Sequence, residues 1–308
     1  MSTVIVFGPT GNIGSVAART AEACGATVWL GMRDTSKAIP TLTAEQEKSG
    51  RFERVEADLT NPDTLTAAVK KSGAKRAFIY LAHGSKDHMK ASLQALKSAG
   101  VEYIVFLSSF TINTPSPADI EPSELIPYVH AQVELSLDSV FGHDNFVAVR
   151  PGAFATNILP YVSGIKAGHV SCPGANFDMD AVTFTDMGEV SGILLASGPK
   201  NGQHEVYVYG PERMTQGEAI KRAGKVVWGN DVEVQDLTGQ DALDAYAKAG
   251  FPKPFADYMA RVISRTDEEA DANHVRYEEG VKNVELYTGH PATKFEDFVE
   301  AHKSLFGA

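Results

Sequence analysis

The sequence has few cysteines and no long apolar run. The only cysteines among its 308 residues are Cys24 and Cys172, and two cysteines are too few for a disulfide framework or a cysteine-rich zinc motif. No stretch approaches the roughly 18–20 apolar residues of a membrane-spanning helix, and the first residues, MSTVIVFGPTG, lack the pattern of a signal peptide. We therefore expect an intracellular protein, in the cytoplasm or also in the nucleus, with no membrane partner and with both thiols in or near the core.

The sequence also has fewer basic than acidic residues. The chain has 28 Lys+Arg against 39 Asp+Glu, a net charge of −11. Such a protein has no general excess of positive charge to neutralise phosphates, so nucleic acid is excluded as an expected partner. Residues 266–308 hold ten of the acidic and four of the basic residues. We expect this segment at the surface.

The first half of the chain alternates short apolar runs with helical patterns. This alternation is typical of βαβ units, and it predicts an α/β fold with a doubly wound parallel sheet. The nearly continuous apolar runs suit strands that are covered on both faces. The predicted strands are 4–7, 27–30, 52–56, 76–81, 103–107 and 146–149, and the predicted helices are 13–24, 61–72, 86–99 and 127–141.

The second half is less regular. Residues 150–180 are rich in Gly, Pro and Asn and predict loops, and residues 111–126, with three prolines, predict a lid. Further strands are predicted at 205–209 and 232–234, and helices at 215–228, 239–248, 252–264 and 294–305. These elements favour a smaller α/β lobe packed against the sheet.

A glycine motif follows the first strand and begins the first helix. Its sequence is GPTGNIG, with the glycines in GxxGxxG spacing. Such glycines permit a tight turn, close approach of a pyrophosphate to the backbone and close packing of helix on strand, and the helix N-terminus attracts the phosphates. A purely structural turn is the alternative. The motif predicts dinucleotide contacts at Gly8, Thr10, Gly11, Asn12, Ile13 and Gly14.

The end of the second strand indicates which dinucleotide binds. An acidic side chain there would bind a ribose 2′-hydroxyl, but the sequence has Met32 and Arg33, and an arginine can bind a 2′-phosphate. Lys37 can add a second positive charge. The alternative is that Arg33 and Lys37 are solvated surface residues without a ligand. Asp58 and Leu59 follow the third strand and are predicted at the adenine, although Asp58 is equally explained as a turn residue. NADP(H) is therefore the predicted cofactor.

Taken together, these motifs resemble the NmrA-like branch of the atypical short-chain dehydrogenase/reductase superfamily. The segments RPGAFATN (150–157), FTDMGEV (184–190) and TGHPATKFEDF (288–298) extend the resemblance over nearly the whole chain, and the last is similar to fungal members. The resemblance implies an NADP(H)-binding Rossmann domain over residues 1–152 and a substrate-side lobe over 153–308, with a possible return to the sheet around 181–210. Further cofactor contacts are expected at strand ends and on one helix, at Ala82, His83, Ser108, Gln132, Pro151, Gly152 and Phe154.

The catalytic position departs from the superfamily pattern. Tyr128 is in register with the proton-donating tyrosine, but the lysine one helical turn later is replaced by Gln132. The cation that would favour a tyrosinate is therefore absent, and Tyr128 is equally explained as an interfacial residue. His83 and Ser109 lie at the carboxyl ends of strands, where ligands bind in such sheets, and a histidine can donate a proton near neutral pH. No spacing of His, Asp or Glu predicts a metal site.

Two functions from different classes follow from this pattern. The first is an NADPH-dependent oxidoreductase that transfers a hydride to a C=O, C=N or conjugated C=C of a small, mostly apolar molecule. The second, implied by the resemblance, is a non-enzymatic NADP(H) sensor that binds a protein partner. A redox-neutral reaction with a structural cofactor is a third alternative.

Overall fold

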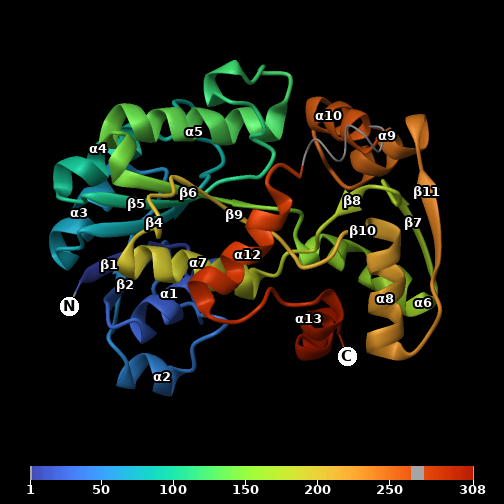
Figure 1. Cartoon of the computed structure of the whole chain (residues 1–308), viewed down its shortest axis with the longest axis horizontal. Coiled ribbons are helices and arrows are strands. Elements are labelled where there is room, and N and C mark those ends of the chain that lie inside the picture. The colour runs from blue at the N-terminus through green and yellow to red at the C-terminus, as the bar shows by residue number, and fades with distance from the viewer. Residues whose placement is uncertain (1, 265–273, 308) are drawn as a thin grey trace.

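A seven-stranded parallel sheet forms the centre of the protein (Figure 1). The computed structural model describes residues 2–264 and 274–307. The strand order is β3-β2-β1-β4-β5-β6-β9, so the chain reverses its direction of winding between β1 and β4. This is the predicted doubly wound Rossmann sheet. The strands are β1 (Thr3–Phe7), β2 (Thr27–Met32), β3 (Phe52–Glu56), β4 (Arg76–Tyr80), β5 (Tyr103–Leu107), β6 (Phe146–Pro151) and β9 (Glu205–Val208).

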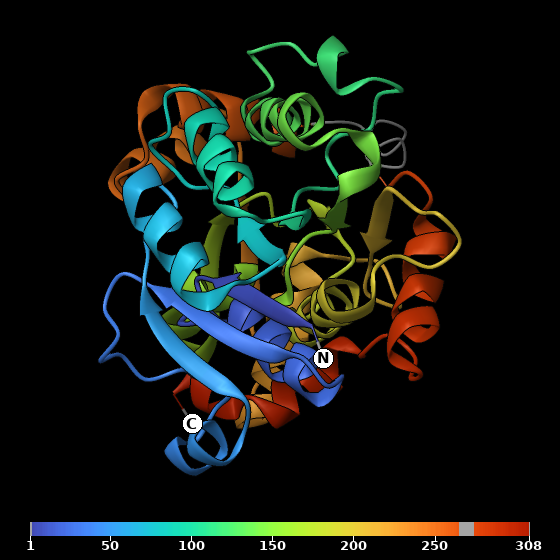
Figure 2. The same cartoon turned by 90° about the vertical axis from the view of Figure 1, so that its left-hand side faces the viewer.

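Helices cover both faces of the sheet, and the alternation of side chains along β1 shows why. Val4 and Val6 point to one core with α1 and α7, whereas Ile5 and Phe7 point to a second core with α3, α4 and α5. Figure 2 shows these two helical layers on opposite sides of the sheet. The helices are α1 (Asn12–Ala23), α3 (Pro62–Ser72), α4 (Lys90–Ala99), α5 (Leu125–Phe141) and α7 (Phe184–Ser197), and the short α2 (Ala44–Ser49) precedes β3.

The smaller lobe lies at the right of Figure 1. Two small sheets form it, in which β7 (His169–Pro173) pairs with β11 (Glu233–Leu237) and β8 (Asp178–Met179) pairs with β10 (Met214–Thr215). Its helices are α6 (Val162–Ala167), α8 (Gln216–Trp228), α9 (Gly239–Lys248), α10 (Lys253–Ile263) and α13 (Phe295–Ala301). The helix α12 (Tyr277–Thr288) returns to pack against α7 and β9. No helix among the described residues is long and apolar enough to cross a membrane.

Several expectations for the second half and for the thiols were wrong. Residues 150–180 are more than loops, because β6 continues through Pro151 and is followed by a 3₁₀ helix (Ala155–Tyr161), α6 and β7. The helices α7 and α12 were not predicted. Cys172 is buried, but Cys24, which follows the last turn of α1, is exposed. The part of the acidic segment at 266–273 lies outside the described residues. In α12 and α13 the acidic side chains are exposed or half-buried.

Candidate functional site

The glycine motif forms a tight turn between β1 and α1. Gly8 has a φ of +72° and its N–H donates to the Gly31 carbonyl at 3.1 Å, while the Gly11 N–H donates to the Gly8 carbonyl at 3.1 Å. A Cβ at Gly14 would lie 2.3 Å from the Gly8 oxygen, so only glycine lets the helix pack this closely. At Gly11 the nearest atom to a Cβ would be 3.5 Å away. Gly14 therefore serves the packing, and Gly11 leaves an open backbone face.

A cavity of about 250 Å³ lies between this turn and the carboxyl ends of β2, β3 and β4. We call it the Arg33 cavity. It brings together residues from the glycine motif, the position after β2 that is predicted to select the cofactor, the predicted adenine edge and the end of β4. From the predicted set it is lined by Gly8, Thr10, Arg33, Lys37, Asp58, Leu59, Ala82 and His83.

Two carboxylates also line the Arg33 cavity. Asp34 Oδ1 accepts hydrogen bonds from the N–H and hydroxyl of Ser36, which lower the pKa of Asp34. Asp58 Oδ1 accepts from the N–H and hydroxyl of Thr60, both at 2.8 Å. The backbone bond from Thr60 lowers the pKa of Asp58 most, and nearby Arg33 adds to this effect. Asp58 thus acts as a turn residue and also lines the cavity.

A second cavity, of about 460 Å³, lies on the other side of the same turn. We call it the Phe154 cavity. From the glycine motif it is lined by Gly8, Thr10, Gly11, Asn12, Ile13 and Gly14, and its walls are largely apolar. An isolated parallel bridge between Phe154 and Val182 joins the segment after β6 to the start of α7, which explains why Phe184 reaches this cavity. The remaining lining residues are Phe78, Tyr80, Leu107, Phe154, Thr156 and Phe184.

Of the cavity residues outside the glycine motif, only Phe154 was predicted to line this second cavity. The sequence analysis missed Phe78, Tyr80 and Leu107 as site residues, and it quoted Thr156 and Phe184 only as parts of family segments. A usable signal existed for two of them. Tyr80 and Leu107 are the last residues of β4 and β5, at the sheet edge where ligands bind in such folds.

The predicted catalytic residues are not brought together in the Phe154 cavity. Tyr128 packs beside buried Ile112 and Ile120 and meets the His88 ring edge-on, with ring centroids 5.9 Å apart. The Ser109 and Thr111 hydroxyls lie 2.8 Å apart and are hydrogen-bonded to each other. The predicted residues that line neither cavity are Ser108, Ser109, Tyr128, Gln132, Pro151 and Gly152, whereas His83 lines the Arg33 cavity.

Gly152 has a packing role instead. A Cβ at this position would lie 1.9 Å from Asp180 Oδ2. Asp180 is buried, and its carboxylate accepts hydrogen bonds from the Ala153 N–H and the Gly210 N–H, both at 2.9 Å. The close approach of Asp180 holds the chain after β6 in place, including the segment that leads to Phe154.

A buried ion pair lies next to the ends of β5 and β6. Arg150 donates from Nη2 and Nε to the two carboxylate oxygens of Glu134, at 2.6 and 3.1 Å, and from Nη1 to the Tyr207 hydroxyl at 3.0 Å. Each member of the pair is 5% exposed. Burial alone would lower the pKa of Arg150, but the charge of Glu134 outweighs this and raises it. The Ser108 hydroxyl donates to Glu134 at 2.5 Å, so its proton is committed to this network.

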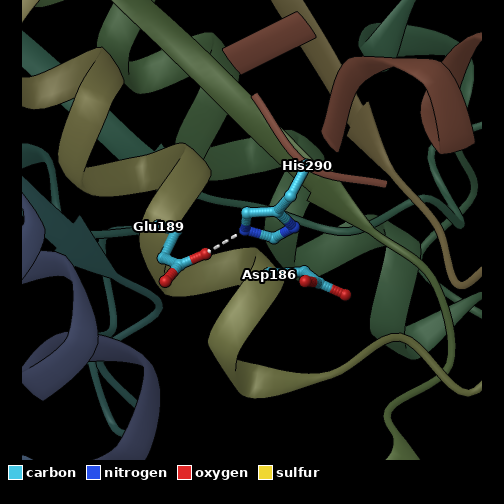
Figure 3. Close-up of side chains that lie close together, drawn as sticks. All are labelled: Asp186, Glu189 and His290. Atoms are coloured by element: carbon cyan, nitrogen blue, oxygen red, sulfur yellow. Dashed lines mark hydrogen bonds and ion pairs between the residues drawn. The ribbon is translucent and has the colours of Figure 1, made fainter. Parts of the chain in front are cut away.

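Three ligand-type side chains meet outside the two cavities (Figure 3). His290 Nε2 lies 2.8 Å from Glu189 Oε2, and Nδ1 lies 2.9 Å from the Pro291 carbonyl. Both ring nitrogens thus face acceptors. The hydrogen bond to Pro291 and then the Glu189 carboxylate raise the pKa of His290. This arrangement favours the imidazolium form.

Asp186, the third member, is buried and connects the same segments. It accepts from the N–H and hydroxyl of Thr293, at 2.9 and 2.8 Å. Burial raises the pKa of Asp186, and the bonds from Thr293 oppose this. The three groups are the type that binds metals, but each is already engaged in an ion pair or hydrogen bonds. We therefore assign them the role of attaching residues 290–293 to α7.

A model of the NmrA-like family matches residues 1–299 of this chain. The chain belongs to the NmrA-like family. A nitrogen metabolite regulation-like protein, bik4, from Gibberella fujikuroi is 34% identical over 97% of this chain and 96% of its own length. An NAD(P)H azoreductase from Xenophilus azovorans is 27% identical over 99% of each chain. Among solved structures, an Escherichia coli NADPH-dependent quinone oxidoreductase complexed with NADPH aligns with a TM-score of 0.72 at 19% identity, covering 97% of this chain and 99% of that chain.

Proposed function

We propose that this NmrA-like protein binds NADP(H) along the carboxyl edge of its sheet. The observation that carries the proposal is that the glycine turn and Arg33 line one cavity. The N-terminus of α1 offers backbone N–H groups to a pyrophosphate, and Gly11 leaves room for it to approach. Arg33 and Lys37 offer charge to a 2′-phosphate. The names of the azoreductase and the quinone oxidoreductase support the same cofactor.

The choice between NADPH and NADH is the direct test of this site. Asp34 is the residue that favours NADH, because a carboxylate there can accept from a ribose 2′-hydroxyl, but one of its oxygens is engaged by Ser36. We expect NADPH to bind more tightly, and Arg33→Ala to reduce the difference by about 1.5–3 kcal/mol, the scale of charge-assisted hydrogen bonds. Titration calorimetry of both cofactors measures this. Arg51→Ala is a control outside the cavities, and equal affinities in the wild type would contradict the proposal.

The proposed reaction is reduction of a small, mostly apolar molecule at a C=O, C=N or conjugated C=C. Leu107, Phe154 and Phe184 supply apolar walls for such a substrate next to the glycine turn. Thr156 and Asn12 offer polar groups on the same side that can orient or polarise it. When bound, NADPH supplies the hydride, and the protein contributes position and polarisation. The names of the similar proteins point to a quinone, which has the proposed conjugated C=O, and to an azo compound, whose N=N bond is a further double bond that can accept a hydride.

The sequence predicts three candidates for the proton donor, which are Tyr128, His83 and Ser109. None of them lines the Phe154 cavity, so we propose that the proton comes from water and that Tyr128 acts in packing. General acid catalysis contributes about 10²–10⁴-fold to rates. A thousandfold slower single-turnover hydride transfer in Tyr128→Phe, with cofactor affinity unchanged, would assign the role to Tyr128.

Turnover can be measured by following NADPH absorbance with a panel of quinones, azo dyes, aldehydes, enones and imines. Oxidation of NADPH by any of these, lost in Gly11→Val, supports the reductase. The second candidate is a sensor of NADP(H), favoured by the name of the bik4 relative and by Gln132 in the place of the catalytic lysine. Tight NADPH binding without turnover of any substrate in the panel would favour the sensor.

A further inference from the structure

A tyrosine ring fills the space that Gly8 leaves beside the glycine turn. Tyr80 is the last residue of β4, and the pairing of Val6 with Phe78 brings Tyr80 level with Gly8 on the neighbouring strand. A Cβ at Gly8 would lie 2.5 Å from Tyr80 Cε1 and 3.2 Å from Cζ. The ring therefore lies directly against the backbone of the first glycine of the motif.

Tyr80 also lies where the two cavities adjoin. It lines both of them, as do Gly8 and Thr10, and it has the largest side chain of these three. The strand order reverses between β1 and β4, and a dinucleotide crosses such a sheet at this switch point. A ligand that reaches from the Arg33 cavity to the Phe154 cavity must therefore pass Tyr80.

We propose that the Tyr80 ring separates the two cavities in the free protein and turns aside when a dinucleotide binds, so that Tyr80 lowers the affinity for the dinucleotide relative to a ligand of the Arg33 cavity alone. This inference rests on the proposed function. Tyr80 is 37% exposed, so solvent borders the residue on the side toward which the ring is proposed to turn. The rotation breaks the contact of the ring with Gly8. The free energy of that contact is therefore subtracted from the binding free energy of the dinucleotide, but not from that of a shorter ligand.

The test compares NADPH with adenosine 2′,5′-bisphosphate, which carries the groups expected in the Arg33 cavity only. In Tyr80→Ala we expect the affinity for NADPH to rise about fivefold, corresponding to about 1 kcal/mol, and the affinity for the bisphosphate to stay within about twofold. Tyr80→Phe keeps the ring and should retain the wild-type ratio of affinities. Tyr246→Ala, on α9 and outside both cavities, is the matched control.

A lower or unchanged NADPH affinity in Tyr80→Ala would overturn the role of Tyr80 while leaving the proposed cofactor intact. Failure of the wild type to bind either ligand would instead refute the proposed function.

Discussion

The buried pair of Glu134 and Arg150 makes the sharpest prediction at the scale of single residues. Because each side chain is 5% exposed, removing one charge leaves the other buried without compensation, at a cost of about 3–5 kcal/mol. We expect Glu134→Gln to lower the free energy of unfolding by this amount, as measured by urea denaturation. The change keeps the shape of the side chain and therefore isolates the charge.

An exposed pair is the matched control for this measurement. Lys75 and Glu102 lie 2.8 Å apart, but their side chains are 58% and 69% exposed. Glu102→Gln should cost less than about 1 kcal/mol, as is usual for surface ion pairs. Equal losses in Glu134→Gln and Glu102→Gln would show that burial does not govern the Arg150 pair.

Two glycines of the same motif should respond differently to substitution. Gly11→Val should leave the protein folded, because a Cβ there meets nothing closer than 3.5 Å, but it should abolish NADPH binding by filling the phosphate approach. Gly14→Val should destabilise the protein itself, because its Cβ would overlap the Gly8 oxygen at 2.3 Å. Circular dichroism and calorimetry separate the two effects. Normal NADPH binding by folded Gly11→Val would place the phosphates elsewhere.

At this scale the Arg33 cavity was predictable, whereas of the Phe154 cavity the glycine motif and Phe154 were predicted and Phe184 was not. Gly8, Arg33 and Asp58 each lie within two residues after the end of a strand, and parallel strands present these ends at one edge. The sequence therefore indicated their meeting. Phe184 follows Val182, which bridges to Phe154 beside the site, and no periodic pattern in the sequence indicates this contact.

At the scale of elements, the helix α7 shows what periodicity misses. It packs against α1, α12 and the sheet, so apolar or small residues occupy nearly all of its sides and no polar face marks it as a helix. By contrast, the amphipathic α8 was predicted almost to the residue, and a capping box from Thr215 to Glu218 marks its beginning. The solvent face of α8 made this helix predictable, whereas the elements that cover α7 leave it without such a pattern.

The attachment of residues 290–293 to α7 predicts a pH dependence. The folded protein raises the pKa of His290, so its imidazolium stabilises the fold fully below the unfolded pKa of about 6.5, and this stabilisation is lost as pH rises through the folded pKa. The difference in unfolding free energy between wild type and His290→Ala should thus shrink as the pH rises above about 6.5. It should stay below about 1 kcal/mol, since His290 is 44% exposed. A difference that grows with pH in urea denaturation would contradict the assignment.

For the whole molecule, the question is whether the proposed division at residue 152 marks separately folding units. One core contains Val4 and Val28 from the first strands, Ile220 from α8 and Phe298 and Phe306 near the carboxyl end. The strand β9 returns after residue 200 to pair with β6 at the edge of the main sheet. These contacts join the two lobes through buried apolar area, and the hydrophobic free energy of that area is lost if either lobe unfolds alone.

We therefore expect one cooperative unfolding transition that NADPH shifts as a whole. A ligand that binds only the folded state stabilises it by about 2.7 kcal/mol at a hundred times its dissociation constant. If the lobes unfold together, this stabilisation applies to the entire transition, and differential scanning calorimetry should show one peak moving upward with NADPH concentration. Two peaks, of which NADPH moves only one, would mean that the lobes unfold independently and that the division near residue 152 is a boundary of stability. The same scan with Arg33→Ala should show a smaller shift at equal NADPH, because the effect depends on affinity and not on the fold.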